Sequence, residues 1–104
     1  MIYVVATVTL QPQARQRFLA EVARLQPEVL AEHGCIEYTP AIDQASGLAR
    51  QIGLRADVVT IVERWQDLAA LTQHSSAPHM LSFRQRVGEL VVSTSLQVLS
   101  PAAP

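Results

Sequence analysis

The sequence predicts an α+β fold, in which four strands form one antiparallel sheet and the helices cover one of its faces. Strand-like alternation of β-branched residues occurs in residues 2–10, 35–42, 58–65 and 91–99. Helix-like spacing of apolar residues fills the connections after the first and the third of these segments. The resulting order of strand, helix, strand, strand, helix, strand is that of the split β-α-β motif.

The first and third strands carry apolar or small side chains on both faces. A sheet covered by helices on one face should carry polar side chains on its other face. Because these strands do not, we expect the other face to be covered as well. A second copy of the sheet is the most economical cover, which predicts a homodimer. In residues 2–10 one face comprises Ile2, Val4, Ala6, Val8 and Leu10, and the other comprises Tyr3, Val5, Thr7 and Thr9.

An amphipathic helix is predicted after Pro12, a residue that suits the first turn because no N–H is needed there. Pro27 lies within the pattern and is expected to kink the helix or to start a second short piece. Gly34 is expected to end the helix in the left-handed conformation. The apolar stripe comprises Ala14, Phe18, Val22, Leu25 and Val29.

The second half begins with a long connection, residues 43–57, in which periodicity disappears and Gln, Ser, Gly, Ala and Arg dominate. We expect it to be mobile and to cover the pocket mouth or reach a neighbouring subunit. Asp67 is the predicted N-cap of a short helix, and Pro78 starts another after Ser75-Ser76. Residues 100–104 are rich in Pro and Ala and should be frayed.

Composition limits the possible classes of function. The 104 residues form a single domain, 1–104, and their net charge of -1 offers no basic stripe, so nucleic-acid binding is not expected. The N-terminal apolar run is too short to span a membrane. Cys35 is the only cysteine and cannot form an intramolecular disulfide, which fits a cytoplasmic protein.

Glu63, Trp65 and His74 are the main candidates for chemistry. Two residues apart on a strand, Glu63 and Trp65 point the same way, and the helix that carries His74 must fold over one face of that sheet. If this is the face to which Glu63 and Trp65 point, a carboxylate, an indole and an imidazole converge on one cavity. The alternative is structural: Glu63 in a rim salt bridge, Trp65 filling the core, and His74 half-buried.

Other side chains could complete such a cavity. His79 starts the stripe of the last helix, although a residue of the first turn can equally bond locally. Tyr38 and Thr7 are strand residues whose hydroxyls could line the pocket or bond a neighbour. Phe83 follows His79 on the same helical stripe and is a candidate for substrate binding.

No cofactor or metal is expected. No pair among the histidines and Cys35 has the helical spacing of a zinc site, and there is no second cysteine. The four glycines are scattered singly, so no phosphate-binding loop is present. Cys35 is interpreted as a packed thiol.

Two motifs resemble those of the antibiotic biosynthesis monooxygenase family. Residues 32–38 are similar to its E-x-G-C-x-x-Y motif, and residues 63–74, followed by Pro78-His79, to its E-x-W-x-D-x-x-A-L-x-x-H…P-H run. The resemblance implies a ferredoxin-like fold, a dimeric α+β barrel, and a hydrophobic pocket in each subunit.

The resemblance also implies a reaction, namely oxygenation of an electron-rich aromatic such as a quinol or anthrone without flavin, haem or metal. His74 is then the proton acceptor, Glu63 fixes its tautomer or a substrate hydroxyl, and Trp65 supplies an apolar wall. The family's haem-degrading branch uses an asparagine on the first strand, where this chain has Thr7. The alternatives are a non-catalytic ligand-binding or stress-associated dimer, and an isomerase of a small metabolite.

Overall fold

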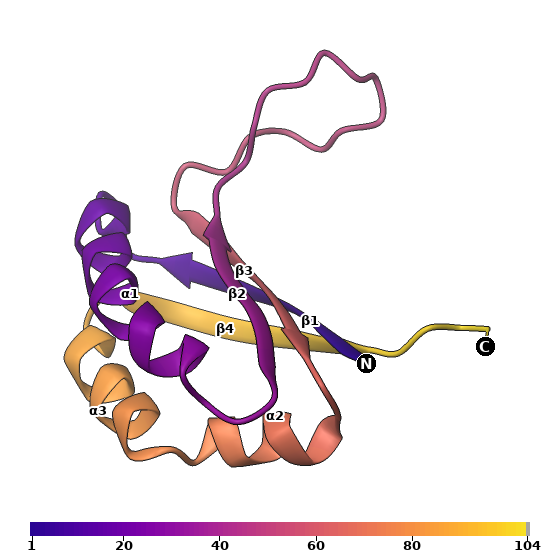
Figure 1. Cartoon of the computed structure of the whole chain (residues 1–104). Helices are drawn as coiled ribbons and strands as arrows, with labels where there is room; N and C mark the ends of the chain where they lie inside the picture. The colour runs from indigo at the N-terminus through magenta and orange to yellow at the C-terminus, as the bar shows by residue number, and fades with distance from the viewer. Residues whose placement is uncertain (104) are drawn as a thin grey trace.

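The fold is a four-stranded antiparallel sheet with three helices on one face, seen in a computed structural model that describes residues 1–103 (Figure 1). The strand order is β2-β3-β1-β4. This confirms the predicted α+β, ferredoxin-like architecture. The strands are β1 (Ile2–Leu10), β2 (Cys35–Ala41), β3 (Val58–Trp65) and β4 (Val91–Leu99), and the helices are α1 (Arg15–Leu30), α2 (Leu68–Ser75) and α3 (Pro78–Val87).

The central strand β1 pairs along almost its whole length with both β3 and β4. Its alternation divides the sheet into two faces. Val4, Ala6, Val8 and Leu10 are buried under the helices. Tyr3 and Val5 point to the helix-free face and remain more than one third exposed, as does Val62 of β3.

Helix α1 buries the predicted stripe of Phe18, Val22, Leu25 and Val29 against the sheet. It begins at Arg15 rather than at Pro12, because Gln13 has a φ of 66° and interrupts the helical path. It also continues through Pro27 as one element. Pro27 lies on the exposed side, so water can reach the carbonyl that loses its N–H donor one turn earlier.

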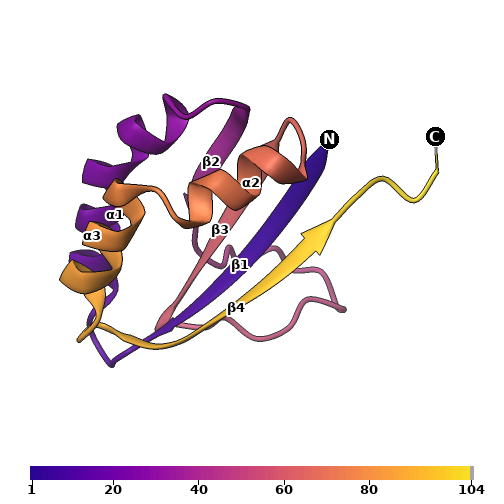
Figure 2. The same ribbon diagram turned by 90° about the horizontal axis from the view of Figure 1, so that it is seen from below.

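The α2–α3 pair follows the sequence signals. The Asp67 side chain accepts a hydrogen bond from the backbone N–H of Ala70 at 2.9 Å, and Pro78 occupies the first turn of α3. Figure 2 shows both helices lying, with α1, on the same side of the sheet. α2 therefore crosses the ends of β2 and β3 and carries His74 over the sheet.

Gly34 fixes the approach of α2 to the start of β2. The sequence predicted that Gly34 would end helix α1. The helix ends earlier, at Leu30, so this prediction is wrong. The φ of Gly34 is +80°, and a Cβ added there would stand 2.6 Å from the Cβ of Ala70. Its carbonyl accepts the N–H of Gln66 at 2.8 Å. Only glycine allows this turn and this close contact together.

The connection between β2 and β3, residues 43–57, contains neither helix nor strand and projects from the sheet (Figure 1). An Asp43–Arg55 ion pair at 2.9 Å closes its base. Figure 2 places it on the side of the sheet away from the helices. None of its residues lines the cavity described below, and a contact with a neighbouring subunit stays a prediction. Its exposed apolar residues are Leu48, Ile52 and Leu54.

Residues 100–103 continue beyond β4 without regular structure, while residue 104, also assigned to the frayed tail, lies outside the described part. Among residues 1–103, no helix has the length and apolar character that crossing a membrane requires.

Candidate active site

A cavity of about 420 Å³ lies between the helix-covered face of the sheet and helices α1, α2 and α3. Its size is within the range of small-molecule sites, about 300–1,000 Å³. Apolar side chains make up most of the wall. The polar side chains that line it belong to Tyr38, Glu63, His74, Ser75, Arg84 and Thr94.

Glu63 is a buried carboxylate that points into this cavity from β3. One of its oxygens, Oε1, accepts a hydrogen bond from Trp65 Nε1 at 2.9 Å, because side chains two apart on a strand share a face. Burial raises the pKa of Glu63, and the hydrogen bond from Trp65 opposes that effect. Its Oε2 bonds no other residue within 1–103, so this oxygen is available to a ligand.

His74 lies in the last turn of α2, buried against Trp65 and Tyr38 with ring centroids 4.6 and 5.6 Å away. Its Nδ1 is 2.8 Å from Oε2 of Glu32. Because an ionised carboxylate can only accept, Nδ1 carries the hydrogen and Nε2 has the free lone pair. Nε2 makes no hydrogen bond to the described residues. His74 therefore presents a base to the cavity.

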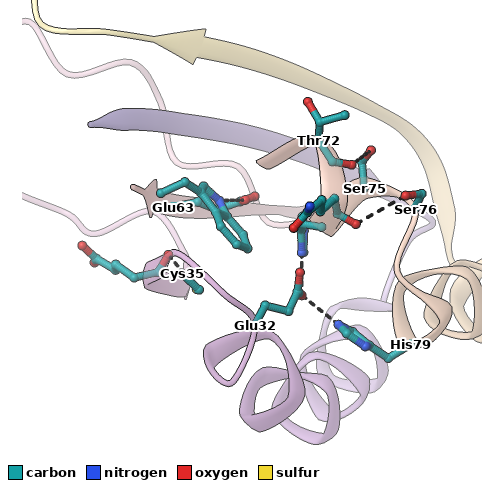
Figure 3. Close-up of polar contacts among 11 residues, drawn as sticks. Glu32, Cys35, Glu63, Thr72, Ser75, Ser76 and His79 are labelled. Carbon is teal, nitrogen blue, oxygen red and sulfur yellow. Dashed lines mark hydrogen bonds and ion pairs between the residues drawn. The ribbon is translucent and has the colours of Figure 1, made fainter. Parts of the chain in front are cut away.

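Glu32 holds two histidines at once, and sequence reasoning gave it no role. Its Oε2 is also 2.7 Å from Nε2 of His79 (Figure 3). Glu32 lies in the short turn between α1 and β2, just before Gly34, so the glycine-dependent packing of α2 brings His74 to it. The available signal was its place at the head of the E-x-G-C-x-x-Y motif, although that motif alone does not identify a partner.

The structure brings Glu63, His74, Tyr38 and Phe83 to the cavity wall, as expected from the sequence. Trp65 was expected to supply an apolar wall, but it is fully buried against His74 and does not line the cavity. Its indole N–H instead donates a hydrogen bond to Glu63. Glu32, and not Glu63, bonds Nδ1 of His74, which corrects the expectation that Glu63 sets its tautomer.

Two further candidates lie outside the cavity wall. His79 is not among the lining residues and reaches the site only through Glu32. Thr7 lies between Ala6 and Val8, which both line the cavity, so its side chain points to the helix-free face. The expectation that Thr7 lines the pocket is therefore wrong.

Tyr38 and Cys35 stay protonated near neutral pH. Burial, together with the charges of Glu63 and Glu32, raises the pKa of Tyr38 well above its usual range, so its hydroxyl is a donor. Burial and the same two carboxylates raise the pKa of Cys35 to about 11. Within residues 1–103, no group of three His, Cys, Asp or Glu side chains is arranged to hold a metal ion.

Fold and cavity together define a class of protein, the small ferredoxin-like α+β domain with acid–base side chains in an apolar pocket under its helices. The sequence model of the antibiotic biosynthesis monooxygenase family matches residues 1–86, and the chain belongs to this family.

Individual relatives extend the similarity over almost the whole chain. The protein named "Probable quinol monooxygenase YgiN" from Escherichia coli (strain K12) is 32% identical over 103 residues, covering 97% of this chain and 98% of that protein. The structure of Rv0793 from Mycobacterium tuberculosis superposes with a TM-score of 0.78 at 27% identity, covering 99% of this chain and 96% of that one. That of PA3566 from Pseudomonas aeruginosa has a TM-score of 0.79 at 24% identity, covering 98% and 94%.

Proposed function

We propose that this protein is a monooxygenase that uses O₂ to oxidise an electron-rich aromatic of the quinol or anthrone class. The observation that carries the proposal is His74, which lines an apolar cavity together with Glu63 and whose Nε2 bonds no residue within 1–103. Membership of the family and the name of the Escherichia coli relative support the same reaction class.

The chemistry begins with a proton transfer. The O–H bond of the bound substrate breaks, and its proton bonds to Nε2 of His74. The resulting phenolate is electron-rich enough to give one electron to O₂, which forms a substrate radical and superoxide. Their combination makes the new C–O bond of a peroxide anion, which takes back the proton from Nε2 of His74. Loss of water from the resulting hydroperoxide leaves a carbonyl product. An apolar wall strengthens the hydrogen bonds that orient these charged species.

Two other groups orient the substrate in this proposal. The hydroxyl of Tyr38 donates to a substrate oxygen, because its raised pKa keeps it protonated. The free Oε2 of Glu63 bonds a second hydroxyl. Phe83, on α3, contacts the ring from the helix side.

We further propose that the reaction needs no flavin, haem or metal, since a deprotonated polyphenol reduces O₂ directly. The sequence also contains no glycine-rich loop for a nucleotide cofactor. The check is an absorption spectrum and elemental analysis of purified protein. A Soret band, a flavin band, or one equivalent of metal would contradict this part of the proposal.

We also propose a cytoplasmic homodimer, with the helix-free faces of two sheets in contact. The half-exposed side chains of Tyr3, Val5 and Val62 support this, because they form apolar surface at the centre of that face.

The test of the reaction is oxygen uptake with a dihydroxynaphthalene substrate, corrected for its autoxidation in buffer. We expect His74→Ala to lower kcat by ~10²–10⁴-fold with a smaller effect on KM, the range for a lost general base. His33→Ala is the matched control, since His33 is exposed and adjacent in sequence to Glu32 but makes no hydrogen bond to it. Full oxygen uptake by folded His74→Ala would refute the assignment.

A further inference from the structure

His74, Glu32 and His79 form a continuous path from the cavity to the surface. One carboxylate oxygen, Oε2 of Glu32, bonds Nδ1 of His74 at 2.8 Å and Nε2 of His79 at 2.7 Å (Figure 3). The exposed fraction of the side chain rises along the path, from 6% for His74 to 12% for Glu32 and 22% for His79. His74 lines the cavity, and His79 is in contact with solvent.

The shared oxygen couples the charges of the two imidazoles. One carboxylate compensates one imidazolium, whereas two imidazolium groups on the same oxygen repel each other in a half-buried site. A proton gained by one ring therefore favours loss of a proton from the other.

The carboxylate of Glu63 also interacts electrostatically with His74 and Glu32, but without a hydrogen bond. None of the remaining titratable side chains around the cluster hydrogen-bonds to Glu32 or to either histidine within residues 1–103. These side chains are Cys35 and Tyr38 on β2, Glu63 on β3 and Arg84 on α3.

We propose that His79 is the group that exchanges protons with solvent for the base in the pocket, an inference that rests on the proposed function. In this proposal the cycle starts with His74 neutral and His79 protonated on both ring nitrogens. When Nε2 of His74 takes the proton of the substrate hydroxyl, the proton on Nδ1 of His79 passes to water, and no electron moves in this step. After the oxygen step, His74 returns its proton to the reduced oxygen, and His79 regains one from water. Glu32 keeps its charge throughout and is a positioning residue.

The first test needs no substrate. In protein with ¹⁵N-labelled histidine, NMR titration of the wild type should show His74 titrating in two steps over a widened pH range. His79→Gln should convert this into a single step, and the control His33→Gln should leave it unchanged. A His74 titration that is the same in the wild type and in His79→Gln overturns the proposal, and a single-step titration in the wild type does so without any variant.

The second test measures turnover. At low buffer concentration we expect His79→Gln to lower kcat about tenfold with little change in KM, and added imidazole to restore the rate. Wild-type kcat in His79→Gln, or a loss that imidazole does not restore, overturns the proposal. If the NMR titration shows the coupling but the wild type takes up no oxygen, the coupling is supported and the proposed monooxygenase is refuted.

Discussion

Trp65→Phe offers a measurable test of how the buried carboxylate of Glu63 is held. The indole N–H is the hydrogen-bond donor to Glu63 within residues 1–103, at 2.9 Å. Phenylalanine keeps an aromatic ring at this fully buried position but removes the donor. Any effect of the missing donor should depend on whether Glu63 is charged.

The sign of that dependence follows from the pKa of Glu63, which burial raises in the folded protein. The folded state therefore holds the proton more tightly than the unfolded state. Stability falls as pH rises from the pKa of an unfolded glutamate, about 4.3, through the folded value. Removing the N–H raises the folded pKa of Glu63 further, so the variant loses more stability across this window.

The magnitude follows from the type of hydrogen bond. A bond to a charged group contributes roughly 1.5–3 kcal/mol, and one between neutral groups about 0.5–1.5 kcal/mol. We therefore expect Trp65→Phe to destabilise the protein by ~1–2 kcal/mol more at about pH 8 than at about pH 4. The smaller ring adds a loss on the order of 1–2 kcal/mol at both pH values.

Urea unfolding followed by circular dichroism is the assay, because the variant lacks the only tryptophan. Protein concentration is held fixed at both pH values. The control is the same substitution made in Glu63→Gln, where the extra loss at high pH should vanish. Equal destabilisation at the two pH values, or a pH effect that persists with Gln at position 63, would refute the reasoning.

Three further predictions concern the fold and assembly. Gly34→Ala should lower the free energy of unfolding, measured with urea, by at least about 1–2 kcal/mol, because Gly34 has a positive φ and contacts Ala70. The control Gly53→Ala, where an added Cβ would meet nothing within 4 Å, should change it little. Equal effects of the two substitutions would contradict this. Sedimentation equilibrium should show a dimer that Val5→Glu converts to an 11.4 kDa monomer, and a monomeric wild type would count against the proposed interface. Residues 43–57 should exchange amide hydrogens faster than β1 and β3, and equal protection in the free protein would disprove their mobility.

The fold was predictable because its signals are local. Alternation in β1 and the stripe of Phe18, Val22 and Leu25 depend on neighbouring residues, and Asp67 and Pro78 mark helix starts directly. The errors at the start of α1 and at Pro27, inside the helix, came from backbone conformation. A left-handed Gln13 and an exposed Pro27 have no distinct pattern in the sequence.

The site was predictable only in part. Glu63 and Trp65 share a face by strand spacing, so their pairing follows from the sequence. The bond between Glu32 and His74 joins residues 42 positions apart, and no periodicity specifies it. It depends on the angle at which α2 packs beside Gly34, which is a property of the tertiary structure.

The raised pKa of Cys35 has a consequence for the durability of the protein. With a pKa of about 11, roughly one thiol in 10⁴ is ionised at neutral pH, and the thiolate is the form that oxidants attack. In the reaction proposed above, a cycle that fails after the electron transfer to O₂ would release superoxide or peroxide. Because burial and the carboxylates of Glu32 and Glu63 suppress ionisation of Cys35, the proposed reaction would then run beside a thiol that its by-products attack only slowly.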